Sequence, residues 1–300
     1  MYSTLPENAS ASLRTMIGIE ARRFARHPLF LLGVVATVAV SVLLNVNDDP
    51  FASDVLSWPI VPAFFVGLPS LVVAAGLTRS TDSAAEAMGT TPGTRARRTL
   101  AVAGACLVPF AAGVIWLAAV FAYVAVRGTH PNEWWFGTMN DVHVVAIMVA
   151  LGPVACLGAA LLGVLVGRWL RFRGAPAAAV VALVAVDIFG QVAWFNANNA
   201  GSTELRLWAP WAMWHSGSFS DGTQWLLGGN PVFYLGYVLV LCGLAVGGAV
   251  WRDRSARTTT LRLRLLGLVA LAAALLALAM LTGPESSVSE PVPFRITEGS

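Results

Sequence analysis

One acid interrupts the long apolar stretches of this 300-residue chain: Asp187, which is followed one helical turn later by Gln191. Residues four apart share a face of a helix, so Gln191 is expected to donate a hydrogen bond to Asp187. An acid inside a bilayer is costly without a partner, and this face should therefore look into the protein. Three roles are open to the pair: a hydrogen bond that fixes helix packing, a substrate pathway, or a proton relay.

A second group of polar residues follows the second apolar stretch. Ser83 and Glu86 have the spacing of a capping box, in which each side chain accepts a hydrogen bond from the backbone of the other residue. Gly89 supplies a stop, residues 90–93 supply a turn, and the next helix begins close to Arg95. The pattern predicts a short helix projecting between two membrane spans, a common device for docking a cytoplasmic partner.

Tryptophan is concentrated in the long hydrophilic segment 196–230. Trp208, Trp211 and Trp214 are three residues apart, which would place them on one face of a helix. Tryptophan favours the boundary between membrane and water, so we expect an interfacial or re-entrant helix here. Its role would be that of an aromatic belt or an outer gate.

Motifs for catalysis and for cofactor binding are missing from the sequence. There is no P-loop, no H-E-x-x-H and no G-x-S-x-G pattern, and the four histidines cannot supply two facing haem ligands. The three cysteines fall in separate apolar stretches, which favours buried core residues over a disulfide or a zinc site: Cys106, Cys156 and Cys242. We therefore expect no catalytic residue, no metal and no cofactor in this chain.

Composition identifies the class of protein. Hydrophobic residues make up 57% of the chain and charged residues only 12%, well outside the range of soluble globular proteins. The net charge of +3 gives no reason to expect nucleic-acid binding.

Seven apolar stretches approach the roughly 20 residues that a helix needs to cross a bilayer. They are continuously apolar rather than alternating, which predicts an all-α polytopic helix bundle and not a barrel. The stretches are 29–45, 60–77, 100–126, 142–167, 175–195, 231–251 and 265–281.

The orientation of the bundle follows from arginine, since short cytoplasmic loops retain positive charge. Of the 19 arginines, 16 lie in alternate hydrophilic segments that begin with the N-terminus. The N-terminus is therefore predicted inside and the C-terminus outside. We expect one membrane domain over 1–300, divided as follows: a cytoplasmic interfacial helix at 1–28, a six-span core at 29–251, a seventh span at 263–282 and an outside tail at 283–300.

The segment from the second span into the third resembles the permease subunits of type-2 ABC exporters. In that family a short acidic helix, followed by a T-P-x-x-R-like turn, forms the coupling helix that docks on the ATP-binding subunit. Glu86, Thr91, Pro92 and Arg95 match this pattern. The stretches 152–172 and 230–252 are similar to a subgroup from high-GC bacteria, and the resemblance covers most of 12–255. A seventh span is a departure, because the family usually has six spans.

The resemblance implies an exporter permease in the bacterial plasma membrane. Its spans consist mainly of alanine, valine, leucine and glycine, which would permit a small amphipathic or apolar substrate. Its partners would be a separate ATPase subunit, which binds ATP, a second permease subunit in a homo- or heterodimer, and membrane lipid. Coupling to the ATPase would use Ser83, Glu86, Thr91, Pro92 and Arg95. Two other functions are open: a non-transporting membrane sensor or assembly protein, and a proton-coupled secondary transporter that uses Asp187.

Overall fold

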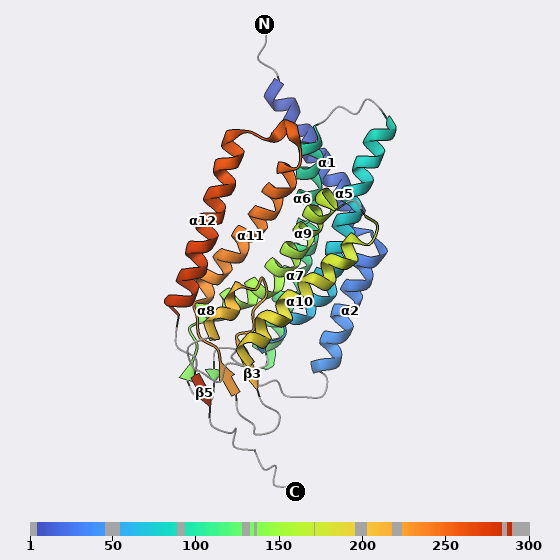
Figure 1. The fold of residues 1–300 in the computed structure, drawn as a ribbon. Coiled ribbons are helices and arrows are strands. Elements are labelled where there is room, and N and C mark those ends of the chain that lie inside the picture. The colour runs from blue at the N-terminus through green and yellow to red at the C-terminus, as the bar shows by residue number, and fades with distance from the viewer. Residues whose placement is uncertain are drawn as a thin grey trace.

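The seven apolar stretches are helical in the computed structural model, apart from a one-residue break at Cys106. The structure describes residues 5–45, 55–88, 94–127, 133–134, 137–170, 172–195, 203–217, 224–283 and 287–289. The helices run roughly along one axis, and the N- and C-termini lie at opposite ends of the bundle (Figure 1). The predicted all-helical membrane-type architecture is confirmed at this level.

The helices in chain order are α1 (Leu5–Ala25), α2 (Pro28–Asn45), α4 (Ile60–Pro62), α5 (Leu68–Met88), α6 (Arg95–Ala105), α7 (Leu107–Arg127), α8 (Asp141–Val149), α9 (Ala155–Trp169), α10 (Ala175–Phe195), α11 (Pro231–Trp251) and α12 (Thr259–Leu281). Two π-helical turns join helices end to end, η1 (Ala63–Gly67) and η2 (Ala150–Val154), and two 3-10 turns lie in loops, η3 (Thr203–Trp208) and η4 (Arg254–Ala256).

Five described helical segments are long and apolar enough to cross a membrane: Ile60–Thr81, Arg95–Arg127, Asp141–Trp169, Pro231–Trp251 and Thr259–Leu281. The pair α1 and α2, which bends by 59°, adds a sixth if it is taken as one span. The apolar part of α10 is shorter, at Ala175–Gln191. These helices are compatible with a multi-pass membrane protein, and the count of seven spans stays a prediction.

The most extensive helix packing joins α5 to α9 at the centre of the bundle. Small residues allow it: a side chain at Gly163 would overlap the backbone of Leu71, and one at Gly167 would lie 2.9 Å from the Ala75 carbonyl oxygen. Glycines four residues apart form one smooth stripe along a helix, which lets two backbones approach. Packing thus stabilises α5 and α9 as the central pair, and α11 and then α12 are added on one side (Figure 1).

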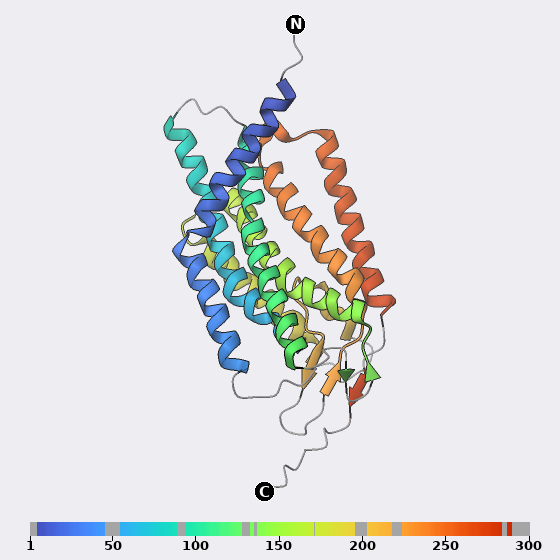
Figure 2. The same ribbon diagram turned by 180° about the vertical axis from the view of Figure 1, so that it is seen from behind.

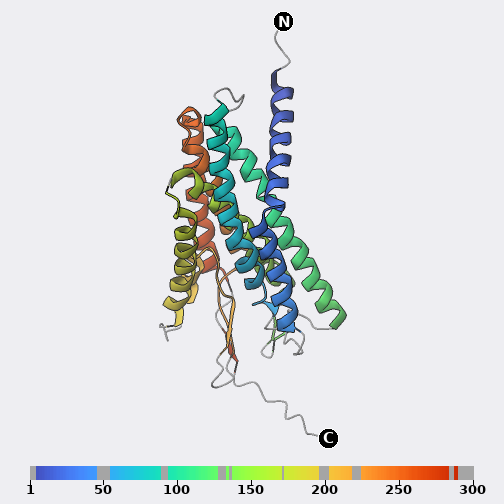
Figure 3. The same ribbon diagram turned by 90° about the vertical axis from the view of Figure 1, so that its right-hand side faces the viewer.

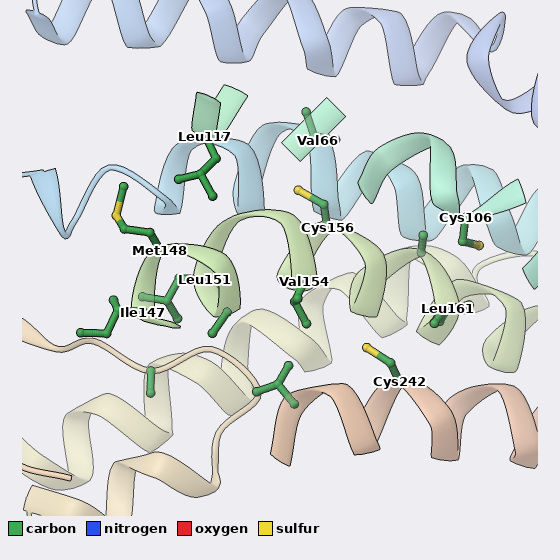
Figure 4. Close-up of a cluster of buried hydrophobic side chains, with 14 of the residues drawn as sticks. Val66, Cys106, Leu117, Ile147, Met148, Leu151, Val154, Cys156, Leu161 and Cys242 are labelled. Atoms are coloured by element: carbon green, nitrogen blue, oxygen red, sulfur yellow. The ribbon is translucent and has the colours of Figure 1, made fainter. Parts of the chain in front are cut away.

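The two π-helical turns face each other in this central region. Each has a proline in it or beside it, Pro153 in η2 and Pro62 immediately before η1, and proline cannot complete the normal helical hydrogen bonds. The Pro62 carbonyl oxygen instead accepts a hydrogen bond from the Cys156 thiol at 3.3 Å. All three cysteines are buried and free, as the sequence predicts (Figure 4).

The N-terminal helix α1 packs mainly against α6 and continues past the end of the other helices (Figure 3). Phe24 is fully buried and meets Phe30 of α2 edge to face at 5.4 Å. These contacts hold the bend between α1 and α2. The placement of 1–28 on a membrane surface stays a prediction.

Short strands gather at the end of the molecule opposite the N-terminus (Figure 2). One antiparallel pair joins β1 (Glu133–Trp134) to β2 (Gly137–Thr138). A second antiparallel sheet has the order β3 (His215–Gly217), β4 (Gln224–Leu226), β5 (Ser287–Ser289). The last strand comes from the predicted tail, so part of 283–300 returns to the bundle end.

Candidate functional site

The predicted docking segment is the projecting end of α5. This helix continues without interruption to Met88 and extends away from the bundle on the side of the N-terminus (Figure 1). The predicted short helix beginning at Ser83 is therefore wrong: Ser83 and Glu86 lie inside α5, because the turn before Ser83 has no residue that breaks a helix. The helix ends immediately before Gly89, as predicted.

The side chains of Ser83 and Glu86 lie outside the described part of the structure, as do Thr91 and Pro92. Arg95 is the first residue of α6. The predicted helix start is confirmed here, since the Thr94 side chain caps α6 by accepting a hydrogen bond from the Arg97 N–H at 3.3 Å.

A second cap on α6 comes from a distant part of the chain. The Asp253 carboxylate, just after α11, accepts hydrogen bonds from the Ala96 backbone N–H at 3.0 Å and from Ser255. Partial burial raises the pKa of Asp253, but the hydrogen bonds from Ser255 and Ala96 and the nearby Arg95 outweigh it, so the pKa is lowered. Asp253 is thus charged at neutral pH and joins the start of α6 to the end of α11.

Arginines join α5 to its neighbours at the same level. Arg23 of α1 forms an ion pair with Glu20 at 2.9 Å and donates to the Ser80 hydroxyl at 3.1 Å. Arg79 donates to the carbonyl of Leu170, at the end of α9, at 2.9 Å. The helix that projects is therefore fastened to α1 and α9 where it leaves the bundle.

The opposite end of the bundle brings together Asp187 and Gln191, but not as a pair bonded to each other. Asp187 Oδ1 accepts from the Trp211 backbone N–H at 3.3 Å. The Gln191 amide donates to the Trp211 carbonyl at 3.0 Å and accepts from the Met213 N–H at 3.2 Å. The predicted hydrogen bond between the two side chains does not form. Instead, both side chains bind the backbone of residues 211–213. This backbone is not helical, so its N–H and C=O groups need partners from elsewhere.

Arg206 is a central residue of this region that the sequence analysis missed. Its side chain is 1% exposed, and it donates to the carbonyls of Met213 at 2.7 Å and Gly228 at 2.8 Å. The guanidinium also lies 5.2 Å from the ring centre of Trp214, a cation–π distance. A sequence signal existed: Arg206 stands alone between Leu205 and Leu207 in a segment rich in tryptophan.

Two tyrosines of α11 complete the set. The Tyr234 hydroxyl donates to the Ala209 carbonyl at 2.9 Å, and the Tyr237 hydroxyl donates to the Trp208 carbonyl at 2.8 Å. Five side chains hold segment 206–213, which the arginine distribution predicts on the outer side of the membrane, and we call them the outer clamp for that predicted side: Asp187, Gln191, Arg206, Tyr234 and Tyr237.

The predicted helical face of tryptophans is wrong. The 3-10 turn η3 ends at Trp208, and Trp211 and Trp214 follow in irregular backbone, because Pro210 lacks an N–H to continue the helix. Trp208 is 42% exposed, whereas Trp214 is 3% exposed and packs edge to face on Tyr234 at 5.6 Å. The rings of Trp208 and Trp214 therefore have different roles, one at the surface and one in the core.

The clamp contacts favour a packing role for Asp187. If that role is correct, two substitutions at Asp187 should have different effects on thermal stability. Asp187→Asn keeps an oxygen for the Trp211 N–H and should change thermal stability little. Asp187→Leu leaves that N–H unsatisfied and should cost about 1–3 kcal/mol. Thermal unfolding in detergent measures both. Transport that is lost in a stably folded Asp187→Asn protein would instead assign Asp187 a proton or substrate role.

Among the described residues, no group of three or more histidine, cysteine or acidic side chains could hold a metal ion. No protein-family model, curated protein or solved structure matches this chain.

Proposed function

We propose that this chain is the membrane-spanning subunit of an ATP-binding-cassette exporter in a bacterial plasma membrane. It has seven spans with the N-terminus in the cytoplasm, and it exports a small amphipathic or apolar substrate. A separate subunit binds and hydrolyses ATP, and a second permease subunit, identical or related, completes the transporter. The observation that carries the proposal is the projecting end of α5, which holds Glu86 beyond the arginine-rich end of the bundle.

A docking element transmits force only if it is stiff and fastened to the parts that must move. The projecting segment is one helix with the central span, so displacement of its tip reaches α9 through the glycine stripe at Gly163 and Gly167. The hydrogen bond from Arg79 to the Leu170 carbonyl adds a direct connection to the end of α9. These contacts support a coupling route from α5 into the bundle centre.

A second route begins on the other side of the same loop. The start of α6 is fastened by Asp253 to the end of α11, and α11 carries Tyr234 and Tyr237 of the outer clamp at its far end. Movement of α6 would thus reach the opposite side of the membrane through one continuous helix. This arrangement supports exchange between a closed and an open outer end during transport.

The direct test is substitution of the acid on the projecting helix. Glu86→Arg should abolish substrate-stimulated ATPase activity of the assembled transporter, because the reversed charge repels the surface that accepts the carboxylate. Membrane insertion and detergent stability should be unchanged, since the residue lies past the bundle. ATPase activity in proteoliposomes and size-exclusion profiles measure the two properties.

Glu133→Arg is the matched control, because Glu133 lies in β1 at the other end of the bundle. It should leave coupled activity intact. Normal coupling in Glu86→Arg would refute the assignment of α5 as the docking element.

The subunit composition tests the proposal as a whole. The tagged chain, purified in mild detergent from its native membrane, should retain a stoichiometric partner that carries a P-loop, identified by mass spectrometry. Recovery of the chain alone, also after cross-linking in intact membranes, would favour the second candidate, a membrane sensor or assembly protein. The firmly held outer segment with the exposed Trp208 ring is the observation in favour of that candidate.

A further inference from the structure

A slot of about 540 Å³ lies between α2 and α7, in the half of the bundle away from the N-terminus. Its volume is within the range of sites for small ligands, about 300–1,000 Å³. The two helices descend together toward that end of the bundle (Figure 3). Trp58, in the turn before α4, lies between them and forms part of the wall.

The walls of the slot are almost entirely apolar. On α7 the lining residues recur every three or four positions, from Trp116 through Ala119 and Tyr123 to Arg127, so they form one face of the helix. At the end of this row farthest from Arg127, the Trp116 indole donates to the Ser41 hydroxyl at 3.1 Å and fastens α7 to α2. The polar groups of Trp116 and Ser41 at this end are therefore already paired with each other.

The slot opens toward the lipid-facing surface. Val38 and Val42 of α2 line it and are 58% and 53% exposed, as lipid-facing residues are. From Trp116 to Arg127 the α7 backbone rises about 16 Å, at about 1.5 Å per residue. This is close to one leaflet of a hydrocarbon core about 30 Å thick.

A positive charge lines one end of the slot, where the exposed Arg127 lies. Arg127 is the last residue of α7, and its guanidinium lies 5.5 Å from the Tyr123 ring centre, which holds it beside the slot. Arginine and aromatic rings are favoured at the level of lipid headgroups. A hydrocarbon slot one leaflet deep with an arginine at headgroup level is complementary to an anionic lipid.

We infer that the slot between α2 and α7 binds one acyl chain of an anionic phospholipid, with the phosphate at Arg127. The site lies in the leaflet that the arginine distribution predicts to be the outer one. It is independent of the proposed coupling to an ATPase.

Photochemical labelling tests the inference on the full chain in nanodiscs of phosphatidylcholine. The probe is phosphatidylglycerol with a diazirine in the middle of one acyl chain, present in trace amount, and labelled peptides are mapped by mass spectrometry. The label should concentrate on α2 and α7. Uniform labelling of all lipid-facing helices, α12 included, would overturn the inference.

Two variants test the acyl-chain contact and the headgroup contact of the lipid separately. Ala119→Phe fills the slot and should reduce labelling there by about tenfold, the effect of about 1.4 kcal/mol. Ala118→Phe is the matched control, because its neighbouring position does not line the slot. Arg127→Gln should leave a phosphatidylcholine probe unaffected and reduce the preference for phosphatidylglycerol by about fivefold.

Size-exclusion profiles ensure that only folded variants are compared. Equal labelling in Ala119→Phe and Ala118→Phe would overturn the inference. Cross-links from the slot to a second copy of the chain, in place of lipid labelling, would overturn it as well and assign the slot to a protein interface.

Discussion

Gly163→Leu is expected to remove most of the folded protein. The side chain would overlap the Leu71 backbone at the closest contact of α5 with α9, and neither backbone can withdraw without separating the two central helices. Overpacking of a rigid core costs about 1–3 kcal/mol, and more where the obstacle is backbone. Because the whole stability of a domain is about 5–15 kcal/mol, we expect a much lower thermal midpoint and a small monodisperse fraction in size exclusion.

Gly76→Leu is the matched control for this prediction. Gly76 lies on α5, one of the same two helices, but it is exposed and a Cβ atom added there would meet no atom within 4 Å. It should express and unfold like the parent protein. Equal losses in both variants would mean that any large residue on these helices is harmful and that the α5–α9 contact has no special weight.

Arg206→Met should release the outer segment. The change keeps an apolar stem of similar length but leaves the carbonyls of Met213 and Gly228 without their donor, and it removes the contact with Trp214. Hydrogen bonds to a buried charge are worth about 1.5–3 kcal/mol each. We expect a loss of about 3–5 kcal/mol. Faster proteolysis within 203–217, measured by limited digestion and mass spectrometry, should accompany it.

Two comparison variants test whether the planar shape of the Arg206 guanidinium group, and not only its charge, holds the segment. Arg206→Lys should restore little, because one ammonium group cannot reach two carbonyls in the directions that the planar fork serves. Arg173→Met removes an exposed arginine and should have no effect. Full stability in Arg206→Lys would show that charge alone, and not the shape of the donor, holds the segment.

The sequence predicts the membrane-type helices well because their signal is local and strong. A stretch of about 20 apolar residues has few alternatives to a helix in a bilayer. Local sequence signals also correctly predict that α5 ends before Gly89 and that α6 begins after Thr94. They fail at Ser83, since the capping-box pattern also occurs within a helix that simply continues.

The outer clamp was only partly predictable. Asp187 and Gln191 were recognisable as a buried polar pair, but their partners are backbone groups of residues 211–213, and no spacing rule identifies which loop backbone lacks hydrogen bonds. The three tryptophans share a spacing of three, yet Pro210 breaks the helix that would align them. Long-range contacts of this kind depend on how the helices assemble.

The π-helical turn η2 has a consequence for the helical segment that contains it. A turn with one extra residue rotates everything beyond it by about 100° around the helix axis. The helices α8 before η2 and α9 after it therefore present different sides to their neighbours, whereas η1 has only the three residues of α4 before it. The segment Asp141–Trp169 is thus two helices joined out of phase, so α9 can tilt together with α5 while α8 keeps its own set of neighbours.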